Sequence, residues 1–156
     1  MVYNTIQFDG WIYVIREIRT EIIINAPIEK IWSILTDFES YSVWNPFIQS
    51  IEGRPNINER LVVTIYPPNK KPMTFRPKII SISNYELTWI GNLLLPGIFD
   101  GEHHFALIPI SDDNTKFLHS EKFSGLLCSP IFGLIGETTK VGFENMNMAF
   151  KKQSES

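Results

Sequence analysis

The longest helical pattern in the chain covers about residues 129–152. At 100° per residue, most of its apolar side chains and one threonine gather on a wide arc, and charged side chains share a narrow strip with an asparagine. Leu134, Val141 and Met148 lie at the far edge of this strip, so the helix is apolar over more than half its girth. A surface helix needs only one apolar stripe, so the width of the arc predicts contacts on more than one side. The arc contains Ile131, Phe132, Ile135, Thr139, Phe143, Met146 and Phe150, and the strip contains Glu137, Lys140, Glu144 and Asn147.

Strand patterns fill most of the chain between Arg60 and Gly125. Apolar residues alternate in short runs, and the turns between these runs are rich in Pro, Gly, Asn and Asp, which is typical of an antiparallel sheet. Pro77 lies inside one predicted strand, and because proline has no amide hydrogen we expect a bulge there. The predicted strands cover residues 20–25, 48–52, 61–66, 73–83, 85–92, 99–108 and 115–123.

Two short helical patterns separate the first of these strands from the others. Pro27 suits the first turn of a helix, and apolar residues recur at helical spacing from Ile28 to Leu35. The aromatic segment 38–46 predicts a second short helix or a turn, closed by Pro46. The order of elements predicts an α+β fold in which a strongly bent antiparallel sheet wraps around the C-terminal helix.

The length of 156 residues is that of one domain. We expect a single domain over residues 1–156, with residues 1–18 as an N-terminal strand or arm and residues 153–156 as a polar tail. Aromatic residues make up 13% of the sequence. This content leaves room for an apolar pocket, although a core rich in Phe explains it equally well.

The net charge is −3, from 14 basic and 17 acidic residues, and no basic cluster occurs. This balance argues against nucleic acid and anionic membranes as partners. Cys128 is the only cysteine, which fits a reducing cytosol. The sequence has no signal-peptide pattern and no apolar run that approaches the ~20 residues of a membrane span. We expect a cytoplasmic monomer or homodimer that needs no cofactor and whose partner is a small hydrophobic ligand.

Several residue runs, in this order of elements, stand out between about residues 18 and 152. They are Ala26-Pro27 with Ile31-Trp32, Leu35-Thr36-Asp37-Phe38 with Tyr41, Trp44-Asn45-Pro46-Phe47, Leu87 with Trp89 and Gly91, Pro96-Gly97, Phe99-Asp100-Gly101-Glu102-His103, the run from His119 to Gly125, and Phe143 with Met146-Asn147. Together they resemble the START-like superfamily, also called SRPBCC or helix-grip, and within it the polyketide cyclase/dehydrase-like branch.

This resemblance implies the helix-grip fold, with a mostly apolar cavity between the helix and the sheet. Such a cavity suits a lipid, a polyketide or an aromatic metabolite. The fold serves cyclases, lipid carriers, plant hormone receptors and chaperone activators, so the resemblance does not decide the function. It also brings no family-wide catalytic residue to this sequence.

Three polar side chains on two neighbouring strands are candidates for chemistry. Because side chains on a strand alternate between faces, His103 shares a face with Phe105, and His119 shares one with Glu121. A hairpin centred on Asp112 would place His103 opposite Glu121 and Phe105 opposite His119. We therefore expect two histidines and a carboxylate to meet on the inner face.

Three hypotheses remain open for this group. Two histidines and a carboxylate are possible zinc or iron ligands, although their spacing is not that of a tight metal motif and we expect no metal. The group could act as a general acid and base on a polyketide-like substrate. In the default interpretation, His103 and Glu121 form a hydrogen-bonded pair that satisfies itself and orients the polar end of a ligand.

The preferred function is binding or transport of a small hydrophobic molecule. The alternatives are a cyclase or dehydratase whose candidate catalytic residues are His103, His119 and Glu121, and a protein-interaction module similar to chaperone activators. The expected ligand-binding residues are Trp89, Gly91, His103, Phe105, His119, Glu121, Phe123, Phe132, Ile135, Thr139 and Phe143.

Overall fold

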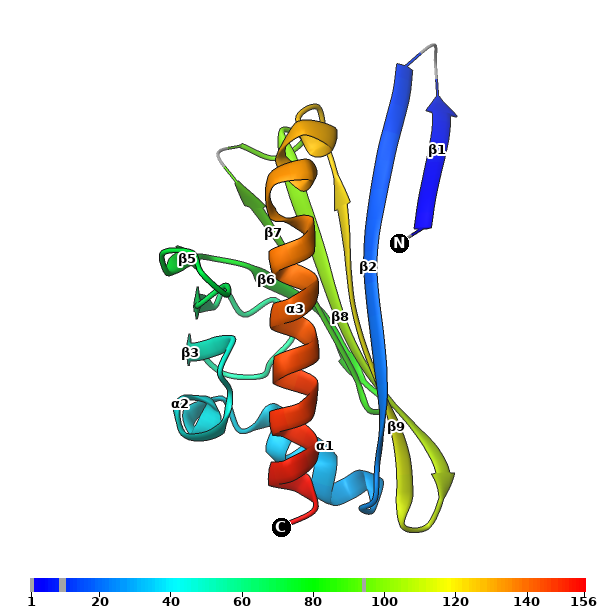
Figure 1. Cartoon of the computed structure of the whole chain (residues 1–156), viewed down its shortest axis with the longest axis vertical. Coiled ribbons are helices and arrows are strands. Elements are labelled where there is room, and N and C mark those ends of the chain that lie inside the picture. The colour runs from blue at the N-terminus through cyan, green and yellow to red at the C-terminus, as the bar shows by residue number, and fades with distance from the viewer. Residues whose placement is uncertain (1, 9–10, 94) are drawn as a thin grey trace.

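A computed structural model describes residues 2–8, 11–93 and 95–156 and has two antiparallel sheets and a long C-terminal helix, α3 (Figure 1). The main sheet has the order β1-β2-β9-β8-β7-β6, and the small sheet has the order β3-β4-β5. The strands are β1 (Val2–Phe8), β2 (Trp11–Ile24), β3 (Ile48–Glu52), β4 (Val62–Ile65), β5 (Met73–Phe75), β6 (Lys78–Ser83), β7 (Glu86–Leu93), β8 (Phe99–Ser111) and β9 (Asn114–Ser124). The helices are α1 (Ile28–Thr36), the 3-10 turn η1 (Phe38–Ser40), α2 (Tyr41–Trp44) and α3 (Cys128–Ser154).

The helix α3 lies along one face of the main sheet, and the small sheet lies beside it (Figure 1). The side chains of the predicted arc face the core: Phe132, Phe143, Met146 and Phe150 are buried, and Ile135 is half-buried. The predicted α+β architecture of a sheet around a C-terminal helix is therefore confirmed. In the described part of the chain, no helix has both the length and the apolarity to cross a membrane.

Strand β2 is longer than the first strand predicted from the sequence. Its predicted range was 20–25, whereas β2 spans Trp11–Ile24. Its N-terminal part pairs with β1, and its part from Arg16 to Ile24 pairs with β9. The described residues of the range 1–18 thus form β1 and the first part of β2, which extend as a hairpin at the upper right in Figure 1.

The prediction of one strand over residues 73–83 is wrong, and the bulge expected near Pro77 corresponds to a register shift slightly further on, in β6. Pro77 instead separates β5 of the small sheet from β6 of the main sheet, and the register shift lies between Ile79 and Ser81. Proline cannot donate to a strand ladder and restricts the residue before it, so the chain changes sheets here. The Pro77 carbonyl accepts from the amide of Leu61 at 2.8 Å, and this bond ties the two sheets together.

Phe47 packs directly on the backbone of α3. A Cβ built on Gly142 would overlap the Phe47 ring, which is 3% exposed. The ring also makes an edge contact with Phe143, with centroids 5.7 Å apart. Glycine at position 142 therefore permits a close approach that positions Phe47, a residue of the cavity described below.

The glycine contact gives the first prediction. We expect Gly142→Ala to lower the free energy of unfolding by about 1–3 kcal/mol, because the added methyl group overpacks the Phe47 contact. Gly133→Ala is the matched control on the same helix, since a Cβ there meets nothing within 4 Å. The control should be neutral or stabilising by up to about 1 kcal/mol. Chemical denaturation of both variants measures the difference, and equal stabilities would contradict the close packing of Phe47.

Candidate functional site

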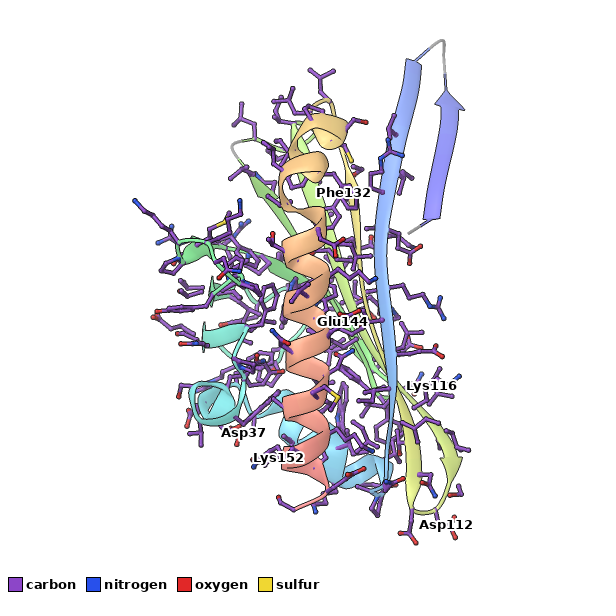
Figure 2. The ribbon with its side chains drawn as sticks, in the orientation of Figure 1. Asp37, Asp112, Lys116, Phe132, Glu144 and Lys152 are labelled. Atoms are coloured by element: carbon purple, nitrogen blue, oxygen red, sulfur yellow. The ribbon has the colours of Figure 1, made fainter. Side chains whose placement is uncertain are left out.

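A cavity of about 150 Å³ lies between α3, the main sheet and the small sheet. Its walls are mostly apolar, and its lining residues Met73, Asn92 and Leu93 are exposed, which places the rim of the cavity there. Figure 2 shows side chains filling the layer between α3 and the sheets, with Phe132 towards the N-terminal end of the helix. The lining residues are Phe47, Ile48, Ile65, Met73, Phe75, Trp89, Gly91, Asn92, Leu93, Phe99, Gly101, His103, Glu121, Phe123, Ile131, Ile135 and Thr139.

Seven of the expected ligand-binding residues line this cavity: Trp89, Gly91, His103, Glu121, Phe123, Ile135 and Thr139. The other four, Phe105, His119, Phe132 and Phe143, are buried but do not line it. The His119 ring stacks on Phe143 with centroids 3.7 Å apart and lies 4.9 Å from Phe105, so these rings form a filled layer behind the cavity. Phe132 packs against Phe123 at 5.5 Å.

Half of the lining residues that the sequence did not predict come from the small sheet and the residue before it, and the others from β7, β8 and α3. Their strands were predicted, but nothing in the alternation pattern says which sheet they join. Pro77 separates the small sheet from β6 of the main sheet, and the cavity lies between the two sheets and α3. The missed lining residues are Phe47, Ile48, Ile65, Met73, Phe75, Asn92, Leu93, Phe99, Gly101 and Ile131.

The register of β8 and β9 is the one predicted from a hairpin centred on Asp112. His103 pairs with Glu121, and Phe105 pairs with His119. The two histidines are thus diagonal neighbours on the inner face, and their Nε2 atoms lie 2.7 Å apart. His103 Nδ1 lies 3.7 Å from Glu121 Oε2, which is too long for a hydrogen bond. The expected hydrogen-bonded pair of His103 and Glu121 is therefore wrong, and the partner of His103 is His119.

A chain of hydrogen bonds leads from this pair to a backbone carbonyl. The Thr20 hydroxyl donates to the carbonyl oxygen of His119 at 3.2 Å, and Asn147 Nδ2 donates to Thr20 Oγ1 at 2.9 Å. Asn147 Oδ1 lies 2.9 Å from His119 Nδ1. A carbonyl can only accept, so Thr20 must accept from the amide, and the amide oxygen must accept from His119.

The direction of this chain sets both histidine tautomers. His119 carries its proton on Nδ1 and therefore accepts at Nε2, where His103 must donate from its own Nε2. His103 then has a lone pair on Nδ1. Glu121 lies beside this nitrogen, and both residues line the cavity.

Burial keeps all three titratable groups neutral. It lowers the pKa of His119 to about 3, against the smaller opposing effect of the Asn147 hydrogen bond. Burial, followed by the effects of His119 and His104, lowers the pKa of His103 well below its usual value. Burial raises the pKa of Glu121 to about 8. At neutral pH, Glu121 is therefore a protonated acid beside a neutral imidazole.

Gly101 makes room for the Glu121 carboxyl group at the cavity wall. Gly91 and Gly101 are cross-strand partners in β7 and β8, and both line the cavity. A Cβ on Gly101 would lie 2.6 Å from Glu121 Oε1. The glycine at 101 therefore leaves the space that the carboxyl group occupies.

Asn147 and Thr20 belong to the site but were not predicted. Asn147 was assigned to the polar strip of the helix, whereas it is buried, with 3% of its surface exposed. It lies four residues after Phe143 and three before Phe150, which places it at the edge of the buried face. Its amide is accommodated there because both ends have partners in the sheet. Its position between two buried aromatics was the available signal.

The geometry gives the metal hypothesis no support. The two imidazoles face one another through Nε2. Among the described residues, no group of three or more His, Cys, Asp or Glu side chains is arranged to hold a metal ion. What the arrangement offers chemically is one lone pair and one carboxyl group at the wall of an apolar cavity.

Comparisons with known proteins agree with this architecture. Residues 16–146 match a family model described as polyketide cyclase / dehydrase and lipid transport. A comparison with curated proteins finds no match. The solved structures that resemble the chain include the Zhui aromatase/cyclase from Streptomyces sp. R1128, with a TM-score of 0.75 and 10% identity, covering 90% of this chain and 94% of that chain.

Two further structures have the same fold. A START superfamily protein from Mycobacterium smegmatis has a TM-score of 0.67 and 21% identity, covering 89% of this chain and 97% of that chain. Norcoclaurine synthase from Thalictrum flavum, in complex with dopamine and hydroxybenzaldehyde, has a TM-score of 0.61 and 18% identity, covering 90% of this chain and 87% of that chain. At such identities the likeness shows the fold alone.

The buried acid predicts how stability depends on pH. Between about pH 4.5 and 8 the folded chain holds a proton on Glu121 that the unfolded chain releases, so this group lowers stability as pH rises. His119 acts in the opposite sense between about pH 3 and 6.5, since there the unfolded chain binds the extra proton. Above about pH 6.5 only the effect of Glu121 remains.

We therefore expect the free energy of unfolding to fall by about 2 kcal/mol between pH 6.5 and 8, at about 1.4 kcal/mol per pH unit. Glu121→Gln should abolish this fall, and Glu137→Gln, on the exposed face of α3, should retain it. Chemical denaturation across this pH range tests both variants. A fall of the same size in Glu121→Gln would show that Glu121 is not the group responsible.

Proposed function

Because the chain belongs to the polyketide cyclase / dehydrase and lipid transport family, we propose that it binds a small, mostly apolar molecule in the cavity between α3 and the sheets. The observation that carries this proposal is the cavity itself, with apolar walls and one polar corner formed by His103 and Glu121. Ligand sites usually combine apolar walls with a few polar groups that fix orientation.

The volume of the cavity narrows the range of ligands. At about 150 Å³ it matches a cavity that holds a single benzene ring. A fused polyketide or a whole lipid would need the walls to move apart. The norcoclaurine synthase structure of the same fold holds dopamine and hydroxybenzaldehyde, which are single-ring molecules. A single-ring compound is thus the ligand class we favour among those expected from the sequence.

The hydrogen-bond chain favours binding over acid–base catalysis by the histidines. A general base works best with a pKa near the operating pH. A proton accepted by His103 would create an imidazolium hydrogen-bonded to His119, whose own pKa burial lowers to about 3. Beyond His119 the chain continues to an amide and a hydroxyl, and neither is a carboxylate that would stabilise an imidazolium.

One observation favours a second candidate function, an enzyme that uses Glu121 for proton transfer. Burial raises the pKa of this carboxyl group to about 8, close to the pH at which a general acid is effective. In that case Glu121→Gln should keep ligand binding but reduce turnover on any substrate found by roughly 100-fold or more. If the protein only binds its ligand, no turnover depends on this residue.

A cavity-filling variant tests the binding proposal. Ile135 lines the cavity, so we expect Ile135→Trp to fill it and abolish binding of p-xylene and p-cresol in ligand-observed NMR. Leu134→Trp is the matched control, because Leu134 is 75% exposed and does not line the cavity. In the wild type and the control, a ligand at 100 times its Kd should stabilise the fold by about 2.7 kcal/mol. Binding that survives in Ile135→Trp would place the ligand elsewhere.

A further inference from the structure

We propose that this cavity selects ligands whose polar end is an uncharged hydroxyl group, as in a simple phenol, with the hydroxyl donating to His103 Nδ1 and lying beside the Glu121 carboxyl group. This inference rests on the proposed binding function and deepens it. It follows from the direction of the hydrogen-bond chain, which leaves an acceptor and not a donor at the cavity end of His103.

The two ends of the hydrogen-bond chain are not equivalent. At the inner end, the His119 carbonyl oxygen accepts from Thr20, and no rearrangement of protons can turn it into a donor. Reversing Asn147 would leave its amide hydrogens facing His119 and its oxygen facing the Thr20 oxygen, whose proton is already committed to the carbonyl. The lone pair on His103 Nδ1 therefore lies at the other end of the chain, four hydrogen bonds from the His119 carbonyl oxygen.

His103 Nδ1 and Glu121 Oε2 are close enough for one oxygen atom to one side of them to contact both. Nδ1 and Oε2 lie 3.7 Å apart, too far to bond directly. One hydroxyl oxygen can lie at about 2.7–2.9 Å from both atoms. It would donate to His103 and accept the proton of Glu121, so that all three polar groups are satisfied. A ligand without a polar end leaves both protein groups unbridged.

Charged ligands fit this corner less well. A carboxylate would direct oxygen lone pairs at the lone pair of His103. An ammonium could ionise Glu121, but the resulting ion pair would lie among apolar walls, where desolvation of both ions opposes binding. The titratable groups that face this corner are His103 from β8 and His119 and Glu121 from β9, and α3 contributes Thr139 to the cavity wall. None of these groups carries a charge that would offset the charge of a ligand.

A matched set of ring ligands tests this inference with the full-length protein. The set is p-cresol, p-xylene, p-toluate and 4-methylbenzylamine, which share one ring and one methyl group and differ in the substituent para to that methyl group. In calorimetric titrations at pH 7, we expect p-cresol to bind about 5- to 10-fold more tightly than p-xylene, as is typical for one added hydrogen bond. The two charged ligands should bind more weakly than p-xylene.

Variants on the two faces of β8 locate the selectivity. His103→Phe keeps an aromatic ring but removes the acceptor, so the preference for p-cresol over p-xylene should fall to about 2-fold or less while p-xylene still binds. His104→Phe is the control, because His104 does not line the cavity and contacts Glu86 on the other face. The control should keep the wild-type preference, and its loss would contradict the role of His103.

A spectroscopic measurement on the wild type does not depend on these variants folding. Imidazole ¹⁵N shifts distinguish a protonated nitrogen from one with a lone pair. We expect His103 to carry its proton on Nε2 and His119 on Nδ1. A His103 proton on Nδ1 would overturn the inference even if p-cresol binds.

The outcomes of the titrations separate two kinds of failure. Equal affinities for p-cresol and p-xylene, or tightest binding of p-toluate or 4-methylbenzylamine, would overturn the hydroxyl selectivity and leave the proposed binding function intact. Failure of every ligand in the set to bind would overturn both.

Discussion

The carbonyl oxygen of His119 can only accept hydrogen bonds, and the proton positions of the whole site depend on this constraint. Thr20, Asn147 and both imidazoles must all donate in one direction to satisfy it. The chain crosses from β2 through α3 to β9 and then β8, so it also ties the helix to the sheet. A polar network buried in an apolar core is stable only if each member is satisfied, and here that requirement specifies the tautomers as well as the packing.

Local patterns were enough to predict the fold and part of the site. The position of the Asp112 turn and the alternation of β8 and β9 correctly predicted that His103 lies opposite Glu121. They could not show that His103 bonds instead to its diagonal neighbour His119, because that depends on side-chain rotamers and on Asn147 from a distant helix. The helical wheel places Asn147 beside charged residues, and the sheet residues that bury it come from distant parts of the chain.

The cavity was the hardest feature to predict, since it depends on residues that lie far apart in the sequence. At Pro77 the chain passes from the small sheet to the main sheet, and Gly142 permits the close contact of Phe47 with α3. Strand alternation for Phe105 and helical periodicity for Phe143 suggested that both would line a pocket, but these rings pack against His119 and fill the space that they face. An inward-facing residue lines a cavity only where the neighbouring side chains leave space unfilled. That depends on how side-chain volumes pack in three dimensions, which a sequence pattern does not show.

The burial on which the proposed selectivity rests also limits the chemistry of this corner of the cavity. Removing water raises the pKa of Glu121 and lowers those of both histidines, so three groups that would be charged or titrating near neutral pH at the surface are neutral here. The proposed preference for neutral ligands follows from this neutrality, and of the three groups Glu121 alone has a pKa near neutral pH. An enzyme built on this site would therefore use the proton of Glu121, whose pKa lies near physiological pH. The acceptor of that proton would be the ligand or the lone pair of His103.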